Sequence, residues 1–292
     1  MQLSQLGEFG LLAELERRGL VDSIGDDVAE LDDGLVLTHD TLVEDVHFRL
    51  DWTSWRDLGY KAAAVNLSDL AAAGADPEGL LVGLAAPPAT ELDAVLELYE
   101  GLHEPGVAVI GGDTTKADRL CIGVTAVGRT ERLPGRAGAR PGDVLVVTGP
   151  LGASAAGYYS LRDGSGGSLA EAHRRPPIRL AEGRELARHS HAMLDLSDGL
   201  ASDAERLAES SGCRVVIDAE RVPIADGVRE TAARLGVEPF ELACGFGEDY
   251  ELLAAVEEPG RFVAVGRCHE GSGAEIRLEG TSVVLAGWDH FR

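Results

Sequence analysis

Aspartates in short polar motifs are the first sign of chemistry in this sequence. Each of five motifs places aspartates in or beside a turn, or at the end of an expected element. Carboxylate oxygens are ligands that Mg²⁺ prefers, and protein-bound Mg²⁺ commonly also binds phosphate groups. The motifs are Gly25-Asp26-Asp27, Thr38-His39-Asp40-Thr41, Asn66-Leu67-Ser68-Asp69, Gly111-Gly112-Asp113-Thr114-Thr115 and Leu194-Asp195-Leu196-Ser197-Asp198-Gly199.

The surroundings of these motifs differ in what they imply. The motifs at 38–41 and 111–115 each follow an apolar strand, where loops commonly carry function. Asp69 lies in a helical pattern of alanine, leucine and valine, so its charge needs a partner such as a metal. Asp195 and Asp198 precede a helix, whose N-terminus favours a phosphate. Any one aspartate in a turn is more often a cap, and spacing alone does not make the five motifs converge.

Three other segments carry residues suited to binding a second molecule. The segment 245–251, Gly-Phe-Gly-Glu-Asp-Tyr-Glu, is either a tight loop that enters a strand or a simple hairpin feature. His47, next to Phe48, is either a ligand contact or an ordinary hydrogen-bonded histidine. Trp288, close to the C-terminus, is either an aromatic platform for a ligand or a hydrophobic anchor.

The elements that must position these residues alternate between helix and strand in both halves of the chain. Capping-box patterns at 54–57 and 90–93 predict two helices. Between residues 129 and 142 the composition shifts to Arg, Gly and Pro, which is typical of a domain boundary. We therefore expect an α/β fold with mixed sheets and two domains, residues 1–135 and 136–292. Apolar runs predict strands at 35–37, 80–86, 107–110, 120–127, 144–147, 192–194, 213–217 and 252–256.

Composition narrows the classes of partner. With 50 acidic and 26 basic residues the formal net charge is −24, which disfavours nucleic acid and anionic membranes as partners. No apolar run approaches the roughly 20 residues of a membrane helix, and no signal peptide pattern opens the chain. The four cysteines form no C-x-x-C pair, which favours reduced thiols. We expect a cytoplasmic protein.

The lysine content excludes one common way of binding ATP. Only Lys61 and Lys116 occur, and neither lies in the G-x-x-x-x-G-K-[ST] pattern of a Walker loop. An acidic protein that binds ATP without such a loop requires divalent cations between its carboxylates and the phosphates.

Taken together, the motifs resemble those of the thiamine-monophosphate kinase family, in the same order and over essentially the whole chain. The N-L-S-D-L-A-A-A-G-A-D-P segment is typical of the wider superfamily, which includes aminoimidazole ribonucleotide synthetase, selenophosphate synthetase and a hydrogenase-maturation protein. The V-x-x-x-H-F and terminal W-D-H-F segments indicate the thiamine branch. The quoted motifs are G-D-D-V-A, T-H-D-T-L-V-E-D-V-H-F, Y-K-A-A-A-V-N-L-S-D-L, G-G-D-T-T-K, L-D-L-S-D-G-L-A-S-D, F-G-E-D-Y-E-L and W-D-H-F.

The resemblance implies a kinase that transfers the γ-phosphoryl group of ATP to thiamine monophosphate. It also implies a homodimer paired through the N-terminal domain, with ATP and several Mg²⁺ ions between the domains. The implied metal ligands are Asp27, Thr38, Asp40, Asp69, Asp113, Asp195 and Asp198, of which Asp40, Asp69, Asp113 and Asp198 are also the expected catalytic residues. The implied nucleotide contacts are Tyr99, Gly112, Asp113, Arg136 and Ser197. The implied contacts to thiamine monophosphate are His47, Glu248 and Trp288.

Two positions depart from the family pattern. His39 stands where threonine or serine is more usual, so it is not assigned as a metal ligand. Phe246 replaces a small residue, which affects the packing expected around Glu248.

The chemistry of the residues agrees with these implications. Phosphoryl transfer depends on positioning and on offsetting charge, and aspartates that carry Mg²⁺ serve both needs without a Walker lysine. Trp288 offers an aromatic face to a cationic thiazolium, worth roughly 0.5–2 kcal/mol. Glu248 either complements that charge or hydrogen-bonds the pyrimidine.

Three alternatives remain open from the residues alone. The first is another ATP-dependent enzyme of the superfamily; selenophosphate synthesis would favour a reactive cysteine near the N-terminus, whereas the first cysteine is Cys121. The second is a partner protein that binds Mg²⁺ and nucleotide without turnover, and the third is an acidic protein without a ligand.

Overall fold

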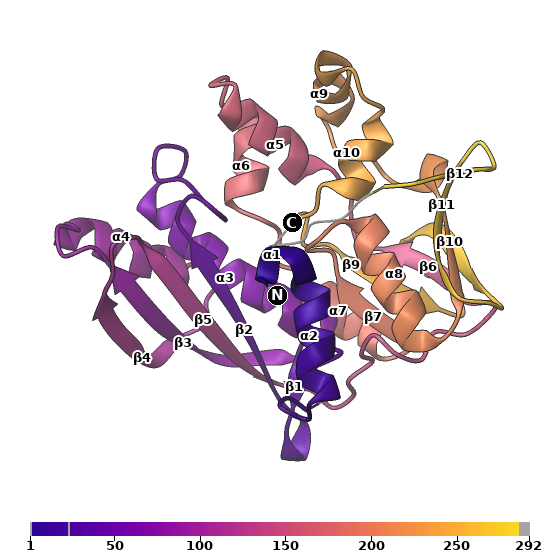
Figure 1. Cartoon of the computed structure of the whole chain (residues 1–292), viewed down its shortest axis with the longest axis horizontal. Helices are drawn as coiled ribbons and strands as arrows, with labels where there is room; N and C mark the ends of the chain where they lie inside the picture. Colours follow the sequence, from indigo (N-terminus) through magenta and orange to yellow (C-terminus); the bar gives the residue numbers. More distant parts are fainter. Residues whose placement is uncertain (1, 23, 286–292) are drawn as a thin grey trace.

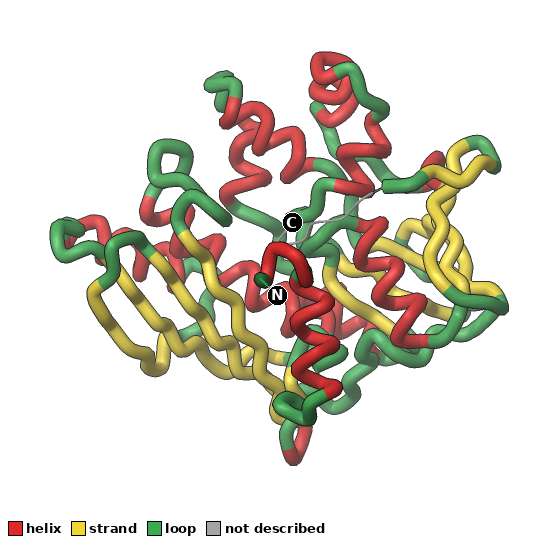
Figure 2. The backbone as a smooth tube through the Cα atoms, viewed as in Figure 1, coloured by secondary structure: helices red, strands yellow, loops and turns green. Residues whose placement is uncertain are grey.

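A computed structural model describes residues 2–22 and 24–285, without the side chain of Phe9. It contains two mixed β-sheets, one from each half of the chain (Figures 1 and 2). The first half is drawn from indigo to magenta and the second from pink to yellow. The predicted α/β fold with mixed sheets is therefore confirmed. Residues 130–143 connect the sheets, and the predicted division after residue 135 falls in this segment and stays a prediction.

The first sheet has five strands in the order β1-β2-β5-β3-β4. β3 and β4 are parallel, whereas β2 and β3 both run antiparallel to β5. Buried side chains in the interior strands largely alternate with partly buried or exposed ones, as expected of a sheet with one covered face. Its strands are β1 (Ala29–Glu30), β2 (Leu35–Val43), β3 (Asp76–Ala86), β4 (Val109–Lys116) and β5 (Cys121–Arg129).

Helices α3 (Trp55–Ala72) and α4 (Leu92–His103) cover one face of this sheet. The Ser54 hydroxyl accepts a hydrogen bond from the Asp57 amide at 3.1 Å, so the predicted N-cap of α3 is confirmed. The helices pack closely, because a Cβ atom at Gly59 would lie 1.9 Å from the Leu98 carbonyl oxygen. The far end of α3 contacts the second half of the chain, where Ala71 and Ala72 pack against its core.

The second sheet has seven strands in the order β12-β11-β8-β10-β6-β9-β7. Its central strands consist of buried aliphatic residues, typical of strands covered on both faces. Its strands are β6 (Val144–Val147), β7 (Ala192–Asp195), β8 (Arg214–Asp218), β9 (Leu252–Val256), β10 (Val263–His269), β11 (Gly273–Leu278) and β12 (Thr281–Val283). The other helices of the described chain are α1 (Leu3–Leu6), α2 (Glu8–Arg17), α5 (Ala153–Arg162), α6 (Ser168–Arg174), α7 (Leu180–Ala187), α8 (Leu200–Ser211), α9 (Val228–Leu235) and α10 (Pro239–Gly245), with short 3₁₀ turns at Asp32–Gly34 and Ala219–Arg221.

Three local expectations were wrong. The Thr38–Thr41 motif lies inside β2, and the Gly111–Thr115 motif lies inside β4, because both strands extend beyond their apolar residues. The capping box expected at Thr90 does not form, since α4 begins after Glu91, which makes no side-chain cap hydrogen bond. Within the described residues, no helix combines the length and the apolar character required to span a membrane.

Candidate active site

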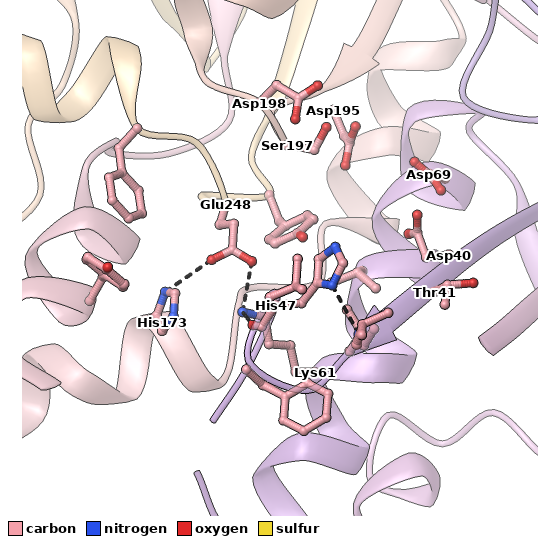
Figure 3. Close-up of a pocket in the computed structure, with 18 of the residues that line it drawn as sticks. Asp40, Thr41, His47, Lys61, Asp69, His173, Asp195, Ser197, Asp198 and Glu248 are labelled. Atoms are coloured by element: carbon pink, nitrogen blue, oxygen red, sulfur yellow. Dashed lines mark hydrogen bonds and ion pairs between the residues drawn. The ribbon is translucent and has the colours of Figure 1, made fainter. Parts of the chain in front are cut away.

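A cavity of about 1140 Å³ is lined by residues of both halves of the chain. Figure 3 shows aspartates gathered on one side of it, with Glu248, Lys61 and His173 on the other. Ten of the predicted site residues line this cavity: Asp27, Thr38, Asp40, His47, Asp69, Arg136, Asp195, Ser197, Asp198 and Glu248.

Three elements bring the aspartates together. Thr38 and Asp40 are two residues apart on β2 and therefore project from the same face of the strand. The Thr38 hydroxyl donates a 2.5 Å hydrogen bond to Asp69 Oδ2, which projects from α3. The Ser68 hydroxyl, also on α3, donates a 2.6 Å hydrogen bond to Asp195 Oδ2 at the end of β7.

Asp27, Asp69 and Asp195 form the acidic cluster. One carboxylate oxygen from each lies within 4.8 Å of the other two. Burial raises the pKa of Asp195 to about 8, and repulsion from Asp27 acts in the same direction. Burial, followed by the charges of Asp40, Asp195 and Asp27, raises the pKa of Asp69 well above its ordinary value. Such crowding of buried carboxyls is costly without a cation.

The acidic cluster fits a hard divalent cation. Its donors are carboxylate oxygens, which suit Mg²⁺ better than the sulfur and imidazole ligands of softer metals. Arg136 forms an ion pair with Asp27 Oδ1, and its Nε lies 3.0 Å from that oxygen. The other oxygen, Asp27 Oδ2, is buried and has no hydrogen-bond partner among the described residues. An orphaned buried oxygen beside two further carboxylates is consistent with a position for a cation.

Asp198 and Ser197 extend the cavity toward helix α8. They follow β7 directly, and α8 begins after Gly199, as the sequence predicts. Asp198 forms an ion pair with Arg206 on α8, and its amide donates a 3.2 Å hydrogen bond to buried Asp203. This arrangement places an arginine and a carboxylate at the same edge of the cavity.

Glu248 occupies the opposite side of the cavity. Its Oε1 lies 2.9 Å from Lys61 Nζ on α3, and its Oε2 lies 3.2 Å from His173 Nδ1 on α6. The segment before β9 has unusual backbone angles, with φ of 90° at Gly247 and 58° at Glu248. It is held by the Glu248 amide, which donates a 2.8 Å hydrogen bond to the Ser197 carbonyl.

Aromatic rings line the same side. Tyr158 packs edge-on against Trp52, His173 and Tyr159, at centroid distances of 5.8, 5.7 and 5.4 Å. The Phe246 ring lies 5.2 Å from the Tyr158 ring, so the large residue that departs from the family pattern belongs to this group. The cavity therefore has an acidic side suited to cations and an aromatic side suited to an organic ring.

Three predicted residues lie away from the cavity, and a fourth is outside the part of the chain that the structure describes. Gly112 and Asp113 lie on exposed β4, which is separated from β2 by β5 and β3, or about 14 Å at the usual strand spacing. Tyr99 lies on α4 and packs against the core beneath the first sheet. Trp288 lies outside the described residues.

Comparison with known proteins identifies the family. The models "AIR synthase related protein, N-terminal domain" and "AIR synthase related protein, C-terminal domain" match residues 25–130 and 140–278. A thiamine-monophosphate kinase of Aquifex aeolicus is 35% identical, with all of both chains covered. The one of Bacillus subtilis is 34% identical and covers 98% of this chain and 100% of its own. The chain belongs to the thiamine-monophosphate kinase family.

Solved structures agree with this assignment to the thiamine-monophosphate kinase family. A structure of AaThiL complexed with AMPPCP and TMP has a TM-score of 0.92 and 34% identity, and the alignment covers 99% of each chain. A structure of the hydrogenase maturation protein HypE in complex with ATP has a TM-score of 0.71 at 19% identity. At this low identity the match shows only that the two proteins share a fold. The resemblance inferred from the motifs is confirmed.

Lys61 and His173 line the site but were not among the predicted residues. Lys61 is a charged residue in an alanine-rich helical segment, and the same feature drew attention to Asp69. His173 lies in the polar sequence Glu-Ala-His-Arg-Arg, which offers no comparable signal.

Proposed function

We propose that this chain is a thiamine-monophosphate kinase, which transfers the γ-phosphoryl group of ATP to thiamine monophosphate and yields thiamine diphosphate and ADP. One observation carries the proposal: the chain matches AaThiL, a protein solved with AMPPCP and TMP, over 99% of its length. The two-sided cavity supports the same conclusion, since one side suits metal-bound phosphates and the other an aromatic acceptor.

On the acidic side, the residues of this chain would hold Mg²⁺ and the phosphates. Asp27, Asp69 and Asp195 are the proposed main ligands, and Asp40 lies close enough to Asp69 to raise its pKa. When bound, Mg²⁺ would offset the negative charge that accumulates on the phosphates during transfer. Arg136, which now pairs with Asp27, would provide a guanidinium for a phosphate group. Thr38 and Asp198 are proposed to assist.

The acceptor needs little activation by the protein. A phosphate oxygen of thiamine monophosphate is already ionised near neutral pH, so a strong general base is unnecessary. The task of the aromatic side is to orient the acceptor so that its phosphate faces the metal-bound ATP. His47 and Glu248 line that side, and Trp288 is proposed to stack on the thiazolium.

A homodimer is part of this proposal. Asp113, Gly112 and Tyr99 lie outside the cavity of one chain, so a role in the nucleotide site requires a second copy that presents β4. The uncovered face of the first sheet supports such pairing, because Ile110 is 60% exposed and Leu81 is 39% exposed.

A cytoplasmic location, where ATP is supplied, is also part of the proposal.

A coupled assay of ADP release tests the proposed function. The purified protein is supplied with Mg·ATP and, in parallel, thiamine monophosphate, thiamine, an aminoimidazole-pathway substrate or no acceptor. We expect ADP release with thiamine monophosphate and little with the others. Nucleotide binding without acceptor-dependent ADP release would favour the non-catalytic alternative, and turnover with another acceptor would favour a different enzyme of the superfamily.

A further inference from the structure

Lys61 is a buried cation that the motifs do not assign to the reaction. Its side chain is 2% exposed and lies on α3 among buried alanines. Its Nζ lies 2.9 Å from Glu248 Oε1 and 3.4 Å from the His47 carbonyl oxygen (Figure 3). Burying an ammonium group is costly unless acceptors surround it. These two contacts therefore hold the Lys61 ammonium and the Glu248 carboxylate in place.

His173 holds the other oxygen of the same carboxylate. Its Nδ1 lies 3.2 Å from Glu248 Oε2 and 2.9 Å from the Ser154 hydroxyl. Burial, followed by the charge of Lys61, lowers the pKa of His173 to about 4. The imidazole is therefore uncharged near neutral pH, and the hydrogen bond of its Nδ1 is made with the Ser154 hydroxyl. Lys61 is left as the charged partner of Glu248.

The contacts of Lys61 offset the cost of partly burying Glu248. Burial raises the pKa of Glu248, but the charge of Lys61 and its hydrogen bond act against burial, and the pKa of Glu248 lies below its ordinary value. Two further titratable groups beside Glu248 belong to its own loop. They are Tyr250 and Asp249, and Asp249 accepts hydrogen bonds from the Gly152 and Ser154 amides.

We propose that Lys61 is a positioning residue that fixes the charge and orientation of the Glu248 carboxylate, so that this carboxylate accepts a hydrogen bond from the ring amine of the acceptor. The inference rests on the proposed function, since it concerns the acceptor side of that site. Because Lys61 already supplies the counter-charge of Glu248, a neutral N–H donor suits this carboxylate better than a second cation. The thiazolium cation is then left to the aromatic rings.

The rarity of lysine in this chain supports the assignment. Of 26 basic residues only two are lysines, and the other, Lys116, is exposed on β4. A guanidinium is larger, planar and forked, whereas an ammonium is a compact point charge. The packed interface between α3 and the Glu248 loop therefore accommodates lysine where the chain uses arginine almost everywhere else.

Kinetics of Lys61→Met test the proposal, with Lys61→Arg as the matched charge-retaining variant. We expect the KM for thiamine monophosphate to rise about 10-fold or more in Lys61→Met, while the KM for ATP stays within about 2-fold. Lys61→Arg should recover part of the loss. Without its counter-charge, the pKa of the partly buried Glu248 rises, so the ratio of variant to wild-type KM should fall as the pH increases from 6 to 9.

A merely structural role predicts a different result. Lys61→Met would then lower the melting temperature and raise both KM values alike, with a ratio independent of pH, and this outcome would overturn the proposal. Failure of the wild-type protein to use thiamine monophosphate is a separate result, which would overturn the proposed function itself.

Lysine-selective NMR of the wild-type protein keeps the test valid if Lys61→Met does not fold. ¹⁵Nζ-lysine labelling gives only two side-chain signals, and Lys116→Arg assigns them. Thiamine monophosphate should shift the Lys61 signal and leave that of Lys116 in place. A Lys61 signal that does not respond to saturating acceptor would contradict the proposal.

Discussion

Asp69→Asn should make the metal-free protein more stable, although it removes a central residue of the site. Asp69 is crowded by Asp27 and Asp195, with carboxylate oxygens within 4.8 Å. Two unit charges at that distance repel by about 3.5 kcal/mol at an effective dielectric constant of about 20. Asparagine keeps the size of aspartate and an oxygen that accepts the Thr38 hydrogen bond, so the substitution removes mainly the charge.

The gain in unfolding free energy is smaller than the full repulsion energy, because the wild-type carboxyls bind protons and so reduce their mutual repulsion. We expect about 1–3 kcal/mol at pH 8, or a rise of about 2–5 °C in melting temperature. The pKa of Asp69 is raised on folding, so its ionisation destabilises the folded state increasingly as pH rises above the unfolded value of about 4. The advantage of Asp69→Asn should therefore be small near pH 5 and larger at pH 8.

Thermal unfolding with EDTA and with Mg²⁺ provides the assay. Mg²⁺ should stabilise the wild-type protein and have much less effect on Asp69→Asn, which should also lose most kinase turnover. Asp226→Asn, at an exposed position, is the control and should change neither property. A lower melting temperature for metal-free Asp69→Asn at pH 8 would refute the reasoning, because it would make the carboxylate a structural hydrogen-bonding group.

Three further predictions follow from the site. Mg²⁺ binding at pH 7 should release protons, since burial raises the pKa of Asp195 to about 8; calorimetry in buffers of different ionisation enthalpy measures this, and no buffer dependence would contradict it. Trp288→Ala should weaken thiamine-monophosphate binding about 5- to 150-fold and ATP binding far less, with partial recovery in Trp288→Phe, whereas equal losses with a large drop in melting temperature would indicate an anchor. Mixing inactive Asp69→Asn and Asp113→Asn proteins should restore about one quarter of the activity if two copies share each site, and no recovery would argue against shared sites.

Much of the fold could be predicted because its elements carry strong local signals. The runs 144–147 and 252–256 match β6 and β9, since continuous aliphatic residues between turn residues leave little alternative. The ends of β2 and β4 were missed because polar residues continue both strands, so the apolar periodicity that marks a strand stops before the strand does. Strand β11 and helices α9 and α10 were also not predicted, because charged and polar residues interrupt their apolar patterns.

The site was predictable in its residue types but not in its geometry. Spacing does not reveal that Asp27, Asp69 and Asp195 meet, because a loop, a helix and a strand end converge only in three dimensions. The pairing of Glu248 with Lys61 joins residues far apart in sequence, and no local pattern connects them. The family resemblance predicted residues on both the acidic side and the aromatic side of the cavity. The contacts among these residues could be seen only in the structure.

The most direct test of the proposed reaction is ³¹P NMR of Mg·ATP and thiamine monophosphate incubated with the purified protein. We predict that the thiamine-monophosphate signal is replaced by the two coupled signals of thiamine diphosphate, in equal amount to the ADP formed. EDTA should abolish the change. Formation of ADP with inorganic phosphate, while the thiamine-monophosphate signal persists, would contradict transfer to this acceptor.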